Sequence, residues 1–70
     1  MNKHVHNLYV VIRDNRVEYA STGLMEFHRY ISGIITGVKS LSYYQKRFIN
    51  HSIIEHTDNL KNEYIFQKVK

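Results

Sequence analysis

Five histidines are the residues of this chain best suited to holding a metal ion. His51 and His56 lie five residues apart, which matches neither the four-residue spacing of one helix face nor the even spacing of one strand face. His4 and His6 precede the first patterned segment, and the chain has no cysteine to supply a thiolate. The sequence therefore predicts no metal site and no cofactor.

Acidic and nucleophilic residues show no catalytic pattern either. The six carboxylates are scattered, and no two of them form a close pair for shared acid and base roles: Asp14, Glu18, Glu26, Glu55, Asp58 and Glu63. Gly33–Gly37 superficially has the form of a glycine-rich loop but is not followed by the Lys-Ser or Lys-Thr of a phosphate-binding loop. We therefore expect a binding protein and not an enzyme.

Basic residues give the strongest functional signal. Ten Lys and Arg against six Asp and Glu give a net charge of +4, which favours polyanionic partners. Arg13 and Arg16 would face each other across a hairpin end, a like-charge pair that an anion would relieve. Three more cations surround a predicted helix that carries Tyr43, as in a helix that contacts phosphates. The predicted nucleic-acid-binding residues are Arg13, Arg16, Lys39, Tyr43, Lys46 and Arg47.

A β-hairpin is the first element predicted to position these residues. Residues 8–13 and 16–20 both alternate with a period of two, which is typical of half-buried strands. Asp14 and Asn15 lie between them and tolerate the positive φ of a two-residue hairpin turn. The resulting register makes two apolar pairs: Ile12 with Val17, and Val10 with Tyr19.

Two helices are predicted to follow the hairpin. Ser21 or Thr22 can cap a helix that begins near Gly23, with apolar residues at positions 24, 27, 31, 34 and 38 and a C-terminal stop at Gly37. Ser42 and Gln45 have the spacing of a capping box for a second helix, which carries Tyr44 and Phe48 on one face. The expected core comprises Ile12, Val17, Tyr19, Leu24, Phe27, Ile31 and Phe48.

The helical apolar pattern is lost after Phe48, because positions 51, 52 and 55 are polar. We therefore predict a second hairpin, with a strand at Ile53-Ile54, a turn within residues 57–62 and a return strand over residues 63–69. The expected fold is a small single α+β domain of order β-β-α-α-β-β over residues 8–70, preceded by a flexible lead-in over residues 1–7. The alternative order is β-β-α-α-β, in which the second helix runs on toward Asp58.

The two helices around Gly37 also partly match a helix-turn-helix motif within residues 29–48. With the flanking hairpin they would form a minimal winged domain. The alignment places small Gly33 and apolar Val38 where the motif requires such residues, but it also places Ser32, Thr36 and Lys46 at positions that the motif buries. The match therefore indicates an architecture and identifies no family.

Length and composition limit the remaining possibilities. Seventy residues support one core, and folding at this size without disulfides or metal leaves a small margin, so a homodimer is expected as one way to stabilise the chain. The longest apolar run, residues 8–12, is too short for a signal peptide or a membrane span, which predicts a cytoplasmic protein with no membrane partner. Frequent Ile, Lys, Asn and Tyr indicate an AT-rich bacterial, phage or mobile-element gene.

Two functions fit these observations. The first is a nucleic-acid-binding accessory or regulatory protein of a phage or mobile element. The alternative is a protein-binding inhibitor or modulator of a host or defence enzyme, which would use exposed tyrosines and arginines as anchors. Basic residues clustered on one face would favour the first function, whereas dispersed charge around an apolar patch would favour the second.

Overall fold

A computed structural model describes residues 7–69 of the chain. Its elements are β1 (Leu8–Arg13), β2 (Arg16–Ser21), α1 (Leu24–Ile34), α2 (Leu41–Asn50), β3 (Ile53–Thr57) and β4 (Glu63–Val69). The predicted β-β-α-α-β-β order is confirmed. The alternative with a longer second helix is wrong, because α2 ends at Asn50 and a strand follows. Apart from Asn7, the expected lead-in lies outside the described residues.

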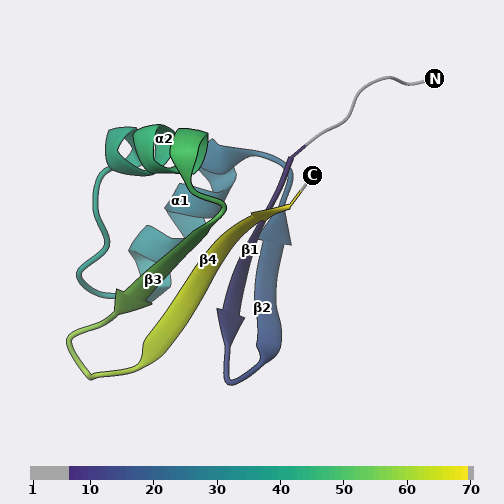
Figure 1. The fold of residues 1–70 in the computed structure, drawn as a ribbon. Coiled ribbons are helices and arrows are strands. Elements are labelled where there is room, and N and C mark those ends of the chain that lie inside the picture. Colours follow the sequence, from purple (N-terminus) through teal and green to yellow (C-terminus); the bar gives the residue numbers. More distant parts are fainter. Residues whose placement is uncertain (1–6, 70) are drawn as a thin grey trace.

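The four strands form one antiparallel sheet of order β2-β1-β4-β3. Each hairpin is sequential, and the two hairpins join through the central pair of β1 and β4. Both helices lie on the same side of this sheet (Figure 1). The other side is therefore left without a covering layer by the described part of the chain.

The first hairpin turns as expected but its register shifts. Asp14 and Asn15 have φ values of 55° and 62°, and the predicted pair of Ile12 and Val17 is present. A bulge then places Tyr19 opposite Val11 instead of Val10, so the predicted pair of Val10 and Tyr19 is wrong. The extra residue, Glu18, puts Val17 and Tyr19 on opposite faces of the sheet, because side chains alternate along a strand.

The helix caps differ from those predicted by one or two residues. Gly23 is the N-cap of α1 and supplies no side-chain bond, while the Ser21 hydroxyl accepts from the Gly23 N–H at 3.1 Å. Ser40, and not Ser42, caps α2 and accepts from the Tyr43 N–H at 3.3 Å. Gly37 has a φ of 78° in the connection over residues 35–40. This connection is longer than the three- or four-residue turn of a helix-turn-helix motif.

The core fills the space between the helices and one face of the sheet. Its buried residues are Val11, Phe27, Ile31, Ile35, Tyr44, Phe48, Ile54, Tyr64 and Phe66. Edge-to-face contacts of Phe27 with Phe48 and Phe66 join both helices to the sheet. Of the expected core, Phe27, Ile31 and Phe48 are buried, and Tyr19 and Leu24 pack against them.

The expected core positions Ile12 and Val17, and the expected apolar helix position Ile34, face away from the core. Val17 is 63% exposed, because the bulge turns it to the uncovered face, where its partner Ile12 also lies. Ile34 is likewise exposed, and Ile35 is buried in its place because α1 ends at Ile34 and the chain becomes extended there.

Candidate binding surfaces

Part of the predicted nucleic-acid site is assembled on α2. Tyr43, Lys46 and Arg47 are three and four residues apart, so they share one face of the helix. Buried Tyr44 and Phe48 fix the rotation of α2 by anchoring its other face in the core. Lys39 lies next to the Ser40 cap at the start of the same helix. We call this group, Lys39, Tyr43, Lys46 and Arg47, the α2 basic stripe.

The α2 basic stripe is tied to the core through aromatic contacts. The guanidinium of Arg47 lies over the Tyr43 ring at 5.9 Å, and the Tyr43 ring meets Tyr44 edge-on at 5.1 Å. The Tyr44 hydroxyl accepts from the Lys39 N–H at 3.2 Å. Burial raises the pKa of Tyr44 and this N–H opposes the rise, so the hydroxyl stays protonated. The stripe is therefore held on a rigid support.

Arg13 and Arg16 form a separate group at the turn of the first hairpin. They are paired across the strands as expected. Arg13 already has partners, since its guanidinium lies 3.7 Å from the Asp14 carboxylate and over the Tyr64 ring at 5.8 Å. The Tyr64 hydroxyl also raises the pKa of Arg13. The like-charge pair thus does not depend on a bound anion for relief.

The structure does not bring these two groups together. The Tyr9 ring contacts Phe48 of α2 at 5.4 Å, which places the C-terminal half of α2 at the Tyr9 end of β1. Arg13 lies four residues further along β1, about 13 Å away at the usual rise of a strand. The hairpin turn and α2 accordingly lie at opposite ends of the sheet (Figure 1). The six residues of the predicted site therefore lie on two separate surfaces.

The uncovered side of the sheet is a surface that the sequence patterns did not predict. Residues that pair across antiparallel strands point to the same side of the sheet. Ile12, Ile65 and Glu55 therefore form one row across β1, β4 and β3. Val10, Gln67 and Ile53 form the next row on the same side. We call this surface the open sheet face. It comprises Leu8, Val10, Ile12, Val17, Ala20, Ile53, Glu55, Thr57, Glu63, Ile65, Gln67 and Val69.

The open sheet face is apolar with an acidic end. Val17 and Ile53 are 63% and 52% exposed, and Ile65 and Val69 are also exposed. Within the strands as described, the charged residues in this register are Glu55 and Glu63 alone. One signal for this face was present in the sequence, because both alternating sets of β1 are apolar and one helical layer covers only one of them.

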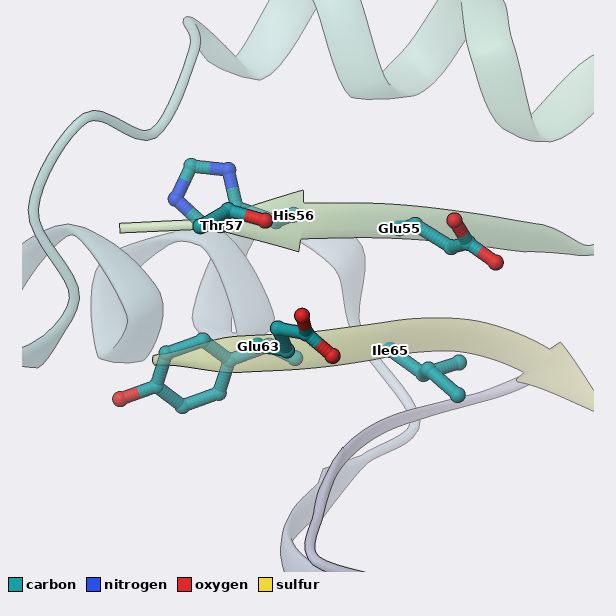
Figure 2. A pocket seen from close by; sticks show the side chains of 6 residues that line it. Glu55, His56, Thr57, Glu63 and Ile65 are labelled. Carbon is teal, nitrogen blue, oxygen red and sulfur yellow. The ribbon is translucent and has the colours of Figure 1, made fainter. Parts of the chain in front are cut away.

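A shallow hollow marks the acidic end of this face. It has a volume of about 210 Å³ and lies where Glu55 and Thr57 of β3 meet Glu63 and Ile65 of β4 (Figure 2). A neighbouring hollow of about 230 Å³ shares Glu63 and Ile65 and continues to Ile12 beside the first turn. The two hollows therefore adjoin at Glu63 and Ile65, and carboxylates line both of them.

Among residues 7–69, no three His, Asp or Glu side chains are grouped so that they could hold a metal ion. In the same span, no helix has the length and apolar character needed to cross a membrane. Comparisons with protein-family models, with curated proteins and with solved structures find no match to this chain.

Proposed function

We propose that this chain is a protein-binding module, and that its open sheet face binds a partner whose surface is apolar and carries Lys or Arg. The observation that supports the proposal is the uncovered apolar surface of the sheet. Several exposed apolar side chains gathered on one face of a sheet typically mark an interaction site. The proposal corresponds to the inhibitor or modulator alternative of the sequence analysis.

The relative magnitudes favour this face over the basic residues. Fully burying an exposed Val or Ile side chain is worth about 1.5–3 kcal/mol. Scaled by their exposure, Val17, Ile53, Ile65 and Val69 together offer on the order of 4 kcal/mol before the entropy cost of association. An exposed ion pair contributes about 0–1 kcal/mol, so each cation of α2 and the hairpin turn offers less than one fully buried Val or Ile side chain.

The charges on the open sheet face indicate the chemistry of the partner. Glu55 and Glu63 border the apolar rows, and complementary charge on a partner fixes its register and speeds its association. A second copy of this chain would bring no Lys or Arg from the described part of the same face to meet these carboxylates. A different protein with a basic and apolar surface therefore fits better than the face-to-face homodimer.

Two amphipathic peptides of equal length test the proposal, one built from Leu and Lys and the other from Leu and Glu. The isoleucine methyl signals of the labelled protein report where each peptide binds. We expect the Leu/Lys peptide to shift Ile12, Ile53 and Ile65 and to leave Ile34 and Ile49 on the helices unchanged. The Leu/Glu peptide should bind about tenfold more weakly, from two lost ion pairs.

The net charge of +4 makes this preference diagnostic, since general electrostatics would favour the Leu/Glu peptide. The double variant Glu55→Gln, Glu63→Gln should remove the preference without changing the fold. Ile53→Ser should weaken binding, whereas the matched change Ile34→Ser on α1 should not. Peptide-induced shifts at the helix methyls instead would contradict the proposal. Shifts of Ile53 and Ile65 that depend on protein concentration alone would also contradict it, because they would assign the face to a second copy of the chain.

A further inference from the structure

The α2 basic stripe lies on the opposite layer of the molecule from the open sheet face, and its charges are not neutralised within the described part of the chain. The described residues contain one ion pair, between Arg13 and Asp14. Lys39, Lys46 and Arg47 thus have no carboxylate within ion-pairing distance among residues 7–69. The first turn of α2 also contains no acidic residue. This end of the molecule presents uncompensated positive charge.

From this arrangement we infer that the α2 basic stripe binds the phosphate backbone of duplex DNA, independently of the proposed protein partner. The site uses Lys39, Lys46 and Arg47 as phosphate contacts. Tyr43 positions Arg47 by holding its guanidinium over the ring. A guanidinium fixed in this way presents its planar donors to a phosphate with less loss of side-chain freedom.

The contacts of Tyr43 favour a duplex over a single strand. Proteins that bind single strands stack bases on exposed aromatic rings. Here one face of the Tyr43 ring carries Arg47 and the ring makes a T-shaped contact with Tyr44, so the ring is engaged within the protein. Contact with the phosphate backbone of DNA is the binding mode that remains, and such contacts position proteins on duplex DNA.

The exposed surface of α2 also fits the shape of a DNA groove. Apart from Leu41, Tyr43 and the buried pair Tyr44 and Phe48, every residue of the helix is exposed. A helix about 10–12 Å across matches the major groove of DNA, which is about 12 Å wide, whereas the deep major groove of RNA excludes side chains. The polar residues Ser42, Gln45 and Asn50 lie on the same exposed part of α2, where groove contacts would form.

Fluorescence anisotropy of a labelled 20-base-pair duplex, titrated at several salt concentrations, tests the inference. Three phosphate contacts should give a slope of log affinity against log salt of about −2.7, so affinity should fall about 40-fold between 50 and 200 mM salt. Lys46→Gln and Lys39→Gln should each make the slope shallower, at about −1.8, so that affinity falls only about 12-fold over the same salt range. Arg47→Lys keeps the charge and should keep the slope while weakening binding.

Two further variants control for net charge, because each removes one positive charge elsewhere. Arg16→Gln at the hairpin turn and Lys61→Gln in the β3–β4 connection should leave the slope unchanged. Unchanged melting temperatures would exclude a folding defect in any variant. Equal loss in all four charge variants, tighter binding to a single strand, binding only to vesicles containing phosphatidylserine, or no duplex binding at 50 mM salt would each overturn the inference. None of these outcomes bears on the open sheet face, which the peptide titration tests separately.

Discussion

Tyr19 of β2 and Tyr30 of α1 stack face to face, with ring centroids 4.0 Å apart and planes inclined by 4°. This contact anchors an edge strand, which otherwise pairs only with β1, to the helical layer. The bulge at Glu18 makes it possible by turning Tyr19 to the helix side while Val17 faces the other way.

The stack should contribute to folding beyond the burial of either ring alone. In a double-mutant cycle, Tyr19→Leu and Tyr30→Leu should show a coupling energy of about 0.5–1.5 kcal/mol. Urea unfolding followed by circular dichroism measures the four free energies of unfolding. Strictly additive losses would show that the stack adds nothing specific.

Phe27 is the strongest single test of the core. It is fully buried and contacts Tyr9, Phe48 and Phe66, so Phe27→Ala should cost about 3–5 kcal/mol and leave the chain largely unfolded. Met25→Ala on the same helix is the control, because Met25 is 63% exposed and its loss should change stability by less than about 0.5 kcal/mol. Thermal melts compare the two variants, and similar melting temperatures would contradict the central position of Phe27 in the core.

Two glycines should respond to the same substitution with opposite signs. Gly37 has a φ of 78°, a left-handed conformation that costs a residue with a Cβ about 1–2 kcal/mol, so Gly37→Ala should destabilise the protein. Gly33 lies within α1, and a Cβ there would meet nothing within 4 Å. Gly33→Ala should therefore stabilise the fold by about 0.5–1 kcal/mol. Chemical denaturation measures the free energy of unfolding of both variants. A change of the same sign in both would contradict the backbone conformations described for the two glycines.

Asp58 should make stability depend on pH in the acid range. Burial raises the pKa of its carboxyl, but N–H donors from Asn62 and Leu60 outweigh burial and leave the pKa below its ordinary value. A lowered pKa in the folded state means that the carboxylate stabilises the fold above about pH 4, and that this contribution is lost as pH falls through the folded pKa. The loss should begin below the ordinary pKa of an aspartate.

Asp58→Asn isolates this contribution, because the amide does not titrate. The variant should be less stable than the wild type at pH 6, and the difference should narrow at pH 3. Denaturant midpoints at the two pH values provide the comparison. A constant difference between the proteins would mean that Asp58 does not act through its charge.

Local patterns were sufficient to predict the elements but not the faces of the sheet. Alternation predicted the first hairpin, the loss of the helical apolar pattern after Phe48 predicted the second, and the 3–4 spacing around Phe27 and Ile31 predicted α1. The sequence could not indicate which alternating set of β1 faces the helices, because Tyr9 and Val11 are as apolar as Val10 and Ile12. The bulge at Glu18 has no marker such as glycine, so the side to which Val17 points could not be predicted.

The candidate site was only partly predictable for a similar reason. Residues on one helix can be placed on a common face from their spacing, and Tyr43, Lys46 and Arg47 do share one. The position of the first turn relative to α2 depends on how the helices lie across the sheet, which no local pattern specifies. The open sheet face is exposed because both helices pack on the other side of the sheet. That arrangement depends on the packing of the whole chain.

The alternation along the strands separates two kinds of evolutionary constraint within single elements. Substitutions at Val17, Ile53, Ile65 and Val69 change the outer surface, while the neighbouring Val11, Ile54 and Phe66 continue to fill the core. Recognition can therefore diversify with little loss of folding stability. A combinatorial library randomised at those four outer positions would use the chain as a small scaffold without cysteine, with its variable surface supported by rigid backbone instead of loops.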